Sequence, residues 1–154
     1  LFAFPSTAGK QLGVSNLKGF EFEAKFQLEA VAMELAYSTI DAEDPNGFEL
    51  SSVPDSQASV WVLWEPADWV EGLSIGGGIR HVGQSVSEDG TVRYETPSYT
   101  LADVVVGYDI DDNISLALNV RNLTDKEYLT SCLVRGDCFP GLRSTVTGTF
   151  TYLL

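Results

Sequence analysis

Residues 98–123 read SYTLADVVVGYDIDDNISLALNVRNL and hold two segments of alternating polarity around a very short turn. A period of two predicts β-strands, because successive side chains of a strand point to opposite faces of its sheet. The pair Asp111-Asp112 predicts the turn, so the two segments predict an antiparallel hairpin. The apolar rows are Ala102, Val104, Val106, Tyr108 and Ile110 in the first segment, and Ile114, Leu116, Leu118 and Val120 in the second.

The same alternation recurs along most of the chain, and no long segment keeps a helical period. Even residues 22–36, which have the best composition for a helix, alternate in polarity and predict a strand. Several of the predicted strands exceed the ~5–6 residues usual in globular sheets and approach the ~9–11 residues that cross a bilayer at a tilt. The predicted strands are 17–28, 30–40, 57–65, 72–83, 98–110, 113–123 and 143–154.

The connections between these strands alternate strictly between short and long. Short turns are expected around Glu29, at 66–71 and at 111–112, and long loops are expected at 41–56, 84–97 and 124–142. Outer-membrane barrels show this order, with short turns on the periplasmic side and long loops outside. Alternating polarity by itself fits a soluble antiparallel sheet equally well. The position of Trp64, Tyr108 and Tyr152, on the apolar rows near one end of three strands, favours a membrane barrel with an interfacial aromatic girdle.

Composition narrows the classes of function. The chain has 154 residues, a net charge of −13 and an isoelectric point near 4.2, which argues against a nucleic-acid partner. No run approaches 18 apolar residues, so no transmembrane helix is expected. A single histidine and two cysteines argue against a metal site built from a cluster of His and Cys residues. Because residue 1 is Leu, we expect the chain to be a piece of something longer.

Strand 57–65 departs from the pattern, because both of its faces are apolar. A soluble core would explain this, and so would a packed barrel lumen. Residues Gly76-Gly77-Gly78 lie within the next predicted strand and have neither the GKS/T sequence nor the following helix of a phosphate loop. We expect them to leave room for a neighbouring ring to lie across the sheet.

Several motifs of this sequence occur in the same order in one known family. The most specific are PSYTLAD at 97–103 and NVRNLTDKEY at 119–128. With them, the chain resembles the TonB-dependent outer-membrane receptors, in the ferric-siderophore branch that includes ferrichrome-type receptors. The other matching pieces are KGFEFE at 18–23, AY at 36–37 with DAE at 41–43, QASVW at 57–61 after VP at 53–54, and GLSIGGGIRHVG at 72–83.

The resemblance implies an all-β fold, an antiparallel transmembrane β-barrel of 22 strands with a separate plug inside. Residues 1–154 would then be the C-terminal part of the barrel domain, its last seven strands, with the plug and the TonB-contacting region elsewhere. The implied ligand is a ferric siderophore as cargo, with no cofactor, and the implied partners are TonB, outer-membrane lipid and the barrel-assembly machinery. The family usually ends in an aromatic residue, whereas this chain ends Leu153-Leu154, which puts the efficiency of assembly in question.

The last long loop holds all but one of the candidate site residues. Cys132 and Cys138 have a spacing unlike CxxC, and an even cysteine count in an exported protein favours a disulfide. The resemblance implies the same pairing, since hydroxamate-type receptors often carry such a pair in this loop. For ligand contact it points to Phe139 and Tyr128, with Tyr99 as a weaker candidate, although each ring has loop packing as an alternative role.

Two other interpretations stay open at this stage. A soluble antiparallel β-sandwich would be a binding module for carbohydrate or protein. A small autonomous outer-membrane barrel would need an eighth strand, for which residues 1–4 are too short. An enzyme is the least favoured class, since no nucleophile or acid–base pair stands out.

Overall fold

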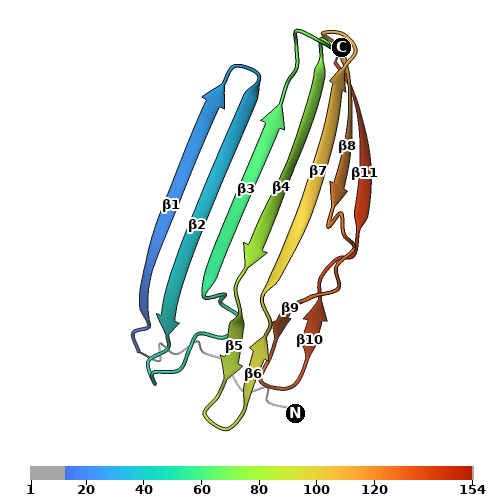
Figure 1. Cartoon of the computed structure of the whole chain (residues 1–154). Helices are drawn as coiled ribbons and strands as arrows, with labels where there is room; N and C mark the ends of the chain where they lie inside the picture. Colours follow the sequence, from blue (N-terminus) through green and yellow to red (C-terminus); the bar gives the residue numbers. More distant parts are fainter. Residues whose placement is uncertain (1–12, 154) are drawn as a thin grey trace, which may run out of the picture.

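The computed structural model describes residues 13–153, and every regular element in this range is a β-strand. Within the described range no helix is long and apolar enough to cross a bilayer. Seven long strands lie side by side in one curved sheet, with two small hairpins at one end (Figure 1). The strands are β1 (Asn16–Leu28), β2 (Val31–Glu43), β3 (Ser56–Trp64), β4 (Leu73–Val82), β5 (Ser85–Glu88), β6 (Arg93–Thr96), β7 (Tyr99–Asp109), β8 (Ile114–Arg121), β9 (Leu129–Cys132), β10 (Cys138–Pro140) and β11 (Thr145–Tyr152).

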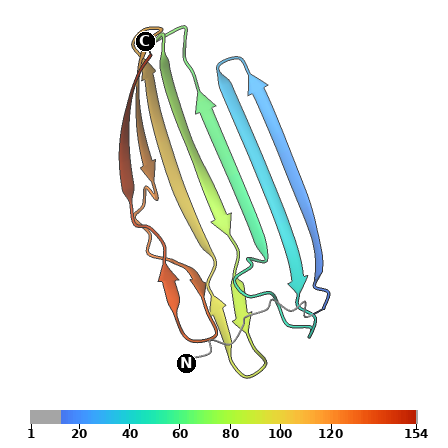
Figure 2. The same cartoon turned by 180° about the vertical axis from the view of Figure 1, so that it is seen from behind.

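The large sheet has the order β1-β2-β3-β4-β7-β8-β11, and each neighbouring pair is antiparallel. Figure 2 shows the same sheet from behind, with β1 and β11 at its two free edges. All seven long strands match the predicted ones to within a few residues, which confirms the all-β antiparallel architecture. The short turns meet at one end of the sheet, the turn end, and the long connections meet at the other, the loop end.

The register aligns the apolar rows of all seven strands on one face. Trp64 lies opposite Ile75, Ile75 opposite Val106, and Val106 opposite Leu118. Since side chains alternate along each strand, these pairings carry every apolar row to the same side, which we call the apolar face. The opposite side, the polar face, carries Glu21, Glu23, Lys25, Gln27, Glu34, Ser38, Gln57, Ser59, Ser74, Arg80, Asp103, Asn119, Arg121 and the threonines of β11.

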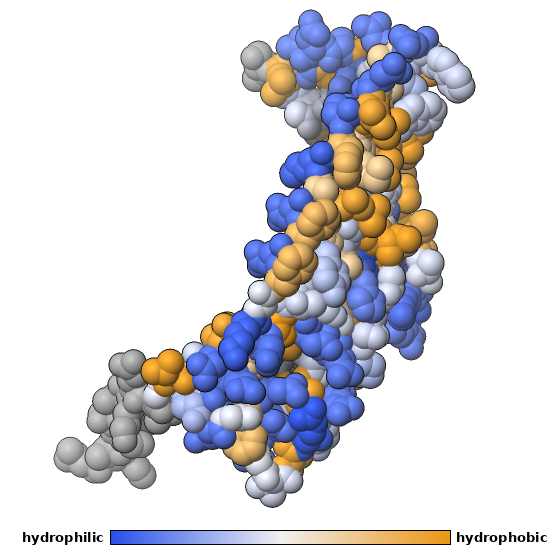
Figure 3. All heavy atoms as spheres, turned by 60° about the vertical axis from the view of Figure 1, so that its left-hand side comes forward, coloured by the Kyte–Doolittle hydropathy of each residue, from blue (hydrophilic) through white to orange (hydrophobic). Residues whose placement is uncertain are grey.

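Nothing in the described chain packs against the apolar face. Leu116 is 42% exposed and Phe150 is 66% exposed, although both lie in the middle of their rows. In the space-filling view, apolar residues gather in the middle of the molecule and hydrophilic residues cover both ends (Figure 3). A soluble sandwich would place a second sheet over this face. The described residues form one layer instead, which removes the support for that alternative.

An apolar patch lies on the polar face, formed by Trp61, Leu63 and Val105 around Gly76 and Gly78. A Cβ atom added at Gly78 would lie 2.5 Å from the Trp61 ring, and one at Gly76 would lie 2.8 Å from Val105 and 3.1 Å from the same ring. The indole therefore lies across two glycines that leave the space for it. This confirms the expected role of the glycine run and explains why strand β3 is apolar on both faces.

The loop end is more ordered than the sequence suggested. Expected loop 84–97 contains the hairpin β5–β6, and expected loop 124–142 contains the hairpin β9–β10. A usable signal was present in the pair Asp89-Gly90, since Asp-Gly is a strong hairpin-turn sequence. Gly90 has a φ of +84°, and Asp89 accepts hydrogen bonds from the amides of Thr91 and Val92. The strands were missed because four residues are too few to show a period.

Candidate functional site

Two tyrosines from different strands meet at the loop end of the sheet. The rings of Tyr99, at the start of β7, and Tyr128, just before β9, lie 4.3 Å apart between centroids with a 36° tilt. Gly141 faces the Tyr128 ring so closely that a Cβ atom there would overlap it. Because Tyr99 shares its row with Asp103, this tyrosine pair lies on the polar face. Two of the three predicted ligand residues are thus brought together.

An ion pair lies next to the tyrosine pair on the polar face. Arg80 of β4 donates from Nε to Oδ2 of Asp103 at 2.8 Å, and both side chains are partly buried. Arg80 is paired across the strands with Leu101, which lies two residues from Tyr99 on the same face. The arrangement presents aromatic surface beside a positioned cation, a combination suited to contacts with a shaped ligand of mixed polarity. Sequence reasoning missed Arg80, whose partner lies on another strand.

Asn122 holds the base of the last long connection. Its side chain donates to the carbonyl oxygens of Lys126 (2.8 Å) and Leu142 (3.0 Å) and accepts from the amide of Lys126 at 2.9 Å. Its own amide donates to Asp103 at 2.7 Å, and the residue is 2% exposed with a φ of +52°. Asn tolerates this left-handed conformation better than most residues. The NVRNLTDKEY motif is therefore structural and sets the position of Tyr128.

A second clamp joins the same connection to the start of β11. The Arg143 guanidinium pairs with the carboxylates of Asp125 and Glu127, and the Ser144 amide donates to Asp125 at 2.8 Å. The hydrogen bonds from Arg143 and then from the Ser144 amide hold the pKa of Asp125 well below its ordinary value of 3.8. The hydrogen bond to Asp125, together with the charges of Asp125 and Glu127, raises the pKa of Arg143.

The structure contains the Cys132–Cys138 disulfide, which joins β9 and β10 at directly paired positions. The hairpin docks on its neighbour, because the Cys132 amide donates to Oγ1 of Thr96 at 2.9 Å and both residues are buried. Phe139 follows the disulfide on β10 and is 45% exposed. Among the described residues no ring contact joins Phe139 to the tyrosine pair, so the three candidates do not form one cluster.

Arg93 connects the first two long loops. Its guanidinium pairs with Glu88, Glu49 and Glu95, and its pKa is raised mainly by the hydrogen bond to Glu88. Backbone bonds reinforce the link, from the Ser52 amide to the Val86 carbonyl and from the Asp55 amide to the Gln84 carbonyl, both 2.9 Å. With the Thr96–Cys132 contact, the three long connections form one continuous rim.

The predicted girdle residues Trp64, Tyr108 and Tyr152 all lie at the turn end on the apolar face. They are 36%, 41% and 55% exposed. A fourth aromatic was missed by the sequence reasoning. Trp69, in the turn between β3 and β4, meets Trp64 edge to face with 6.0 Å between ring centroids. Periodicity gave no signal for it, because it lies in a connection.

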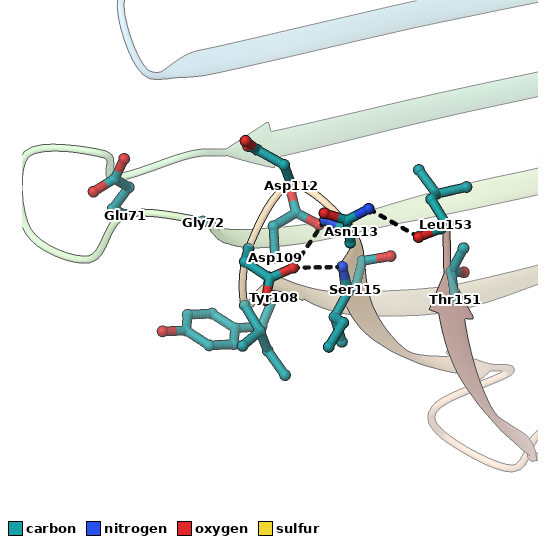
Figure 4. A pocket seen from close by; sticks show the side chains of 12 residues that line it. Glu71, Gly72, Tyr108, Asp109, Asp112, Asn113, Ser115, Thr151 and Leu153 are labelled. Atoms are coloured by element: carbon teal, nitrogen blue, oxygen red, sulfur yellow. Dashed lines mark hydrogen bonds between the residues drawn. The ribbon is translucent and has the colours of Figure 1, made fainter.

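A hollow of about 530 Å³ also lies at the turn end, lined by Glu71, Asp109, Asp112 and the last strand (Figure 4). Asn113 donates from Nδ2 to the carbonyl of Leu153 at 2.8 Å, which fastens β11 to the turn before β8. Among residues 13–153 no group of three or more His, Cys, Asp or Glu side chains has the arrangement of a metal site. The hollow is lined by the turn between β7 and β8 and by the end of the chain beside it.

Comparison with known proteins gives the class of this structure. The chain is 33% identical over 160 residues to the ferrioxamine B receptor of Salmonella typhimurium, covering 96% of this chain and 23% of the relative. It is 33% identical over 151 residues to the ferrichrome outer membrane transporter/phage receptor of Escherichia coli, covering 91% and 20%. The ferric-catecholate import receptor Fiu of E. coli superposes with a TM-score of 0.76 at 24% identity, covering 90% and 21%. These proteins place the sheet among outer-membrane receptor barrels.

The model of the TonB dependent receptor-like β-barrel matches residues 3–123. The chain belongs to this family of outer-membrane proteins. It spans between a fifth and a quarter of the length of the curated relatives described above.

Proposed function

We propose that this chain forms part of an outer-membrane receptor that takes up a ferric siderophore with energy supplied through TonB. The observation that carries the proposal is the 33% identity to the ferrioxamine B receptor over 96% of the chain. A second relative, the ferrioxamine receptor of Yersinia enterocolitica, is 32% identical over 97% of the chain. The role is binding and energised passage of an iron chelate rather than catalysis.

In this proposal residues 1–154 are the C-terminal part of the barrel domain, and the plug and TonB-contacting region belong to the rest of the protein. Strands β1 and β11 are unpaired at the two edges of the sheet. Unpaired backbone groups in hydrocarbon each cost several kcal/mol, so in a membrane further strands would have to pair with these edges, which supports the proposal that the sheet is part of a larger barrel wall. A small autonomous barrel is disfavoured. With seven antiparallel strands, β1 and β11 run in the same direction, so closing the ring would require a parallel pair.

The two faces of the sheet suit such a wall. The apolar face would contact lipid, the polar face would line the lumen, and the loop end would form part of the outer vestibule. Tyr99 and Tyr128 would meet the ligand at the mouth, and Phe139 would meet it farther out on the disulfide hairpin. A hydroxamate–iron complex is shaped and mostly uncharged, so aromatic walls with a few polar contacts suit it.

The test uses the full-length receptor in a strain that lacks its own hydroxamate-siderophore receptors. We expect uptake of ⁵⁵Fe-ferrioxamine B, and we expect Tyr128→Ala and Tyr99→Ala each to weaken its binding at least several-fold. Tyr37→Ala is the matched control. Tyr37 lies near the level of Tyr99 on the opposite, apolar face, since it is joined to Thr100 through the paired residues Ala58 and His81.

The outcomes separate the parts of the proposal. If all variants reach the surface and Tyr37→Ala weakens binding as much as Tyr128→Ala does, the tyrosine pair is not the contact. If the unaltered receptor takes up no hydroxamate chelate while a TonB-dependent control receptor does so in the same strain, the proposed ligand class is wrong.

A further inference from the structure

The ion pair between Arg80 and Asp103 uses only part of the guanidinium. Arg80 donates from Nε to Oδ2 of Asp103 at 2.8 Å, and within the described part of the chain its two Nη groups have no protein acceptor. The Arg80 side chain is 33% exposed, whereas that of Asp103 is 18% exposed. Because a guanidinium carries its N–H donors in a fixed planar fork, the donors on both Nη groups stay available to another partner.

Asp103 fixes the direction of this fork, because both of its carboxylate oxygens are engaged. Oδ2 accepts from Arg80, and Oδ1 accepts from the Asn122 amide at 2.7 Å. Asn122 in turn donates to the Lys126 carbonyl at 2.8 Å and so holds the connection that carries Tyr128. One carboxylate therefore sets the position of a cation on β4 and supports the position of an aromatic ring beyond β8.

Arg80 lies between the tyrosine pair and a hollow on the polar face. Across the strands it is paired with Leu101, two positions from Tyr99. On the side away from β7, a hollow of about 400 Å³ is lined by Arg80 and by residues of β1, β2 and β3. This volume falls within the ~300–1,000 Å³ typical of small-molecule sites. The polar side chains of the lining, besides Arg80, are Glu21, Glu23, Ser38, Gln57 and Ser59.

We propose that Arg80 is a further siderophore-binding residue and that Asp103 is its positioning residue, which rests on the siderophore uptake proposed above. The Nη groups of Arg80 donate to oxygen atoms on the surface of a ferric hydroxamate, while Tyr99 and Tyr128 cover its carbon chain. Hydroxamate oxygens that coordinate iron carry partial negative charge, so a charge-assisted hydrogen bond from a guanidinium suits them. Arg80 thereby supplies the directional polar contact that an aromatic wall lacks.

The test measures binding of ferrioxamine B to the purified full-length receptor in nanodiscs, through quenching of its tryptophan emission. Arg80→Gln removes the cation. Asp103→Asn removes the acceptor for Arg80 but keeps an Oδ1 atom that can accept from the Asn122 amide, and a double variant combines both changes. Lys25→Gln is the matched control, because it removes one positive charge from the polar face on β1, with β2 and β3 between it and β4.

We expect Arg80→Gln to raise the Kd about ten-fold or more, Asp103→Asn to raise it about three-fold, and Lys25→Gln to change it less than about two-fold. The decisive comparison is between Asp103→Asn and the double variant, because both lack the carboxylate and differ only at the cation. We expect the double variant to bind about ten-fold more weakly than Asp103→Asn does. Equal binding by these two variants would overturn the proposal, since Arg80 would then act only by neutralising Asp103.

Arg80→Lys gives a second comparison in which Asp103 keeps a cationic partner, so folding is preserved. A lysine ammonium that pairs with Asp103 lacks the fork that also reaches the ligand, so we expect its Kd to rise about three-fold or more. An unchanged Kd for Arg80→Lys would contradict the role given to the Nη groups.

The same measurement separates this inference from the proposed function. If the unaltered receptor does not bind ferrioxamine B, the proposed ligand class fails and the role of Arg80 fails with it. If the unaltered receptor and Arg80→Gln bind ferrioxamine B equally tightly, only the role of Arg80 is wrong.

Discussion

Placing a charge on each of two neighbouring residues of β8 tests which face of the sheet meets lipid. Leu118 lies on the apolar face between Val106 and Gly148 and is 48% exposed in the chain by itself. Asn119 follows it and lies on the polar face, opposite Val105 and Thr147. Both residues are well inside the strand, so Leu118→Arg and Asn119→Arg differ mainly in the direction of the new side chain.

An arginine on the lipid face near the bilayer centre costs ~2–4 kcal/mol. We therefore expect Leu118→Arg to lower the free energy of unfolding by that amount, which is roughly 25- to 700-fold in the folding equilibrium constant. Asn119→Arg should change it by less than ~1 kcal/mol, because an arginine facing an aqueous lumen keeps its hydration.

The measurement is a urea titration of the full-length receptor folded in phospholipid vesicles, followed by tryptophan emission. The two variants and the unaltered receptor are compared at the same lipid ratio. Equal losses for the two variants, or a larger loss for Asn119→Arg, would contradict the assignment of the faces on which the transport proposal depends.

Four further predictions follow from the contacts described above. Gly78→Ala should destabilise the receptor by about 1–3 kcal/mol by overpacking against Trp61, while Gly77→Ala, whose added Cβ would have ordinary 3.5 Å contacts, should stay within ~1 kcal/mol in the same titration. Asn122→Ala should cost about 1–3 kcal/mol by leaving its buried partners unsatisfied and should expose residues 124–142 to protease, and unchanged cleavage would show that the clamp is dispensable. Replacing Cys132 and Cys138 by Ser should remove about 2 kcal/mol and loosen the hairpin while the barrel still assembles, which gel mobility of unheated samples would report. Because the pKa of Asp125 is lowered, the pairing of Asp125 stabilises the loop base at every pH above the ordinary 3.8 and is lost only as the pH falls below that value. Hydrogen exchange at the Ser144 amide should therefore stay slow at pH 5 and become faster in strong acid. Asp125→Asn should make exchange at this amide fast at both pH values.

The long strands were open to prediction because each presents the same simple pattern many times. Residues 98–123 alternate over two full strand lengths, so the strands and their turn follow from period and turn chemistry. The role of the glycine run could also be predicted, because glycines within a strand have no side chains and leave space that a side chain of the adjacent strand fills. Here the filling residue is Trp61, on the adjacent strand.

The candidate site was only partly predictable. The resemblance pointed to Tyr99, Tyr128 and Phe139, but only the two tyrosines meet, and nothing in the sequence indicated that Arg80 would lie beside them. The hairpins of the rim were missed for a related reason. Each is held by contacts across loops far apart in the chain, such as Thr96 with Cys132 and Arg93 with Glu49.

The sequence by itself determined the strands, their two chemically distinct faces and the alternation of short and long connections, because each depends on residues close together in the chain. The tertiary structure alone decided the pairing register, and with it the alignment of seven separate apolar rows into one face. It also decided which side chains share the mouth and that Trp69 joins Trp64. These features depend on distances between residues tens of positions apart, which no local pattern encodes.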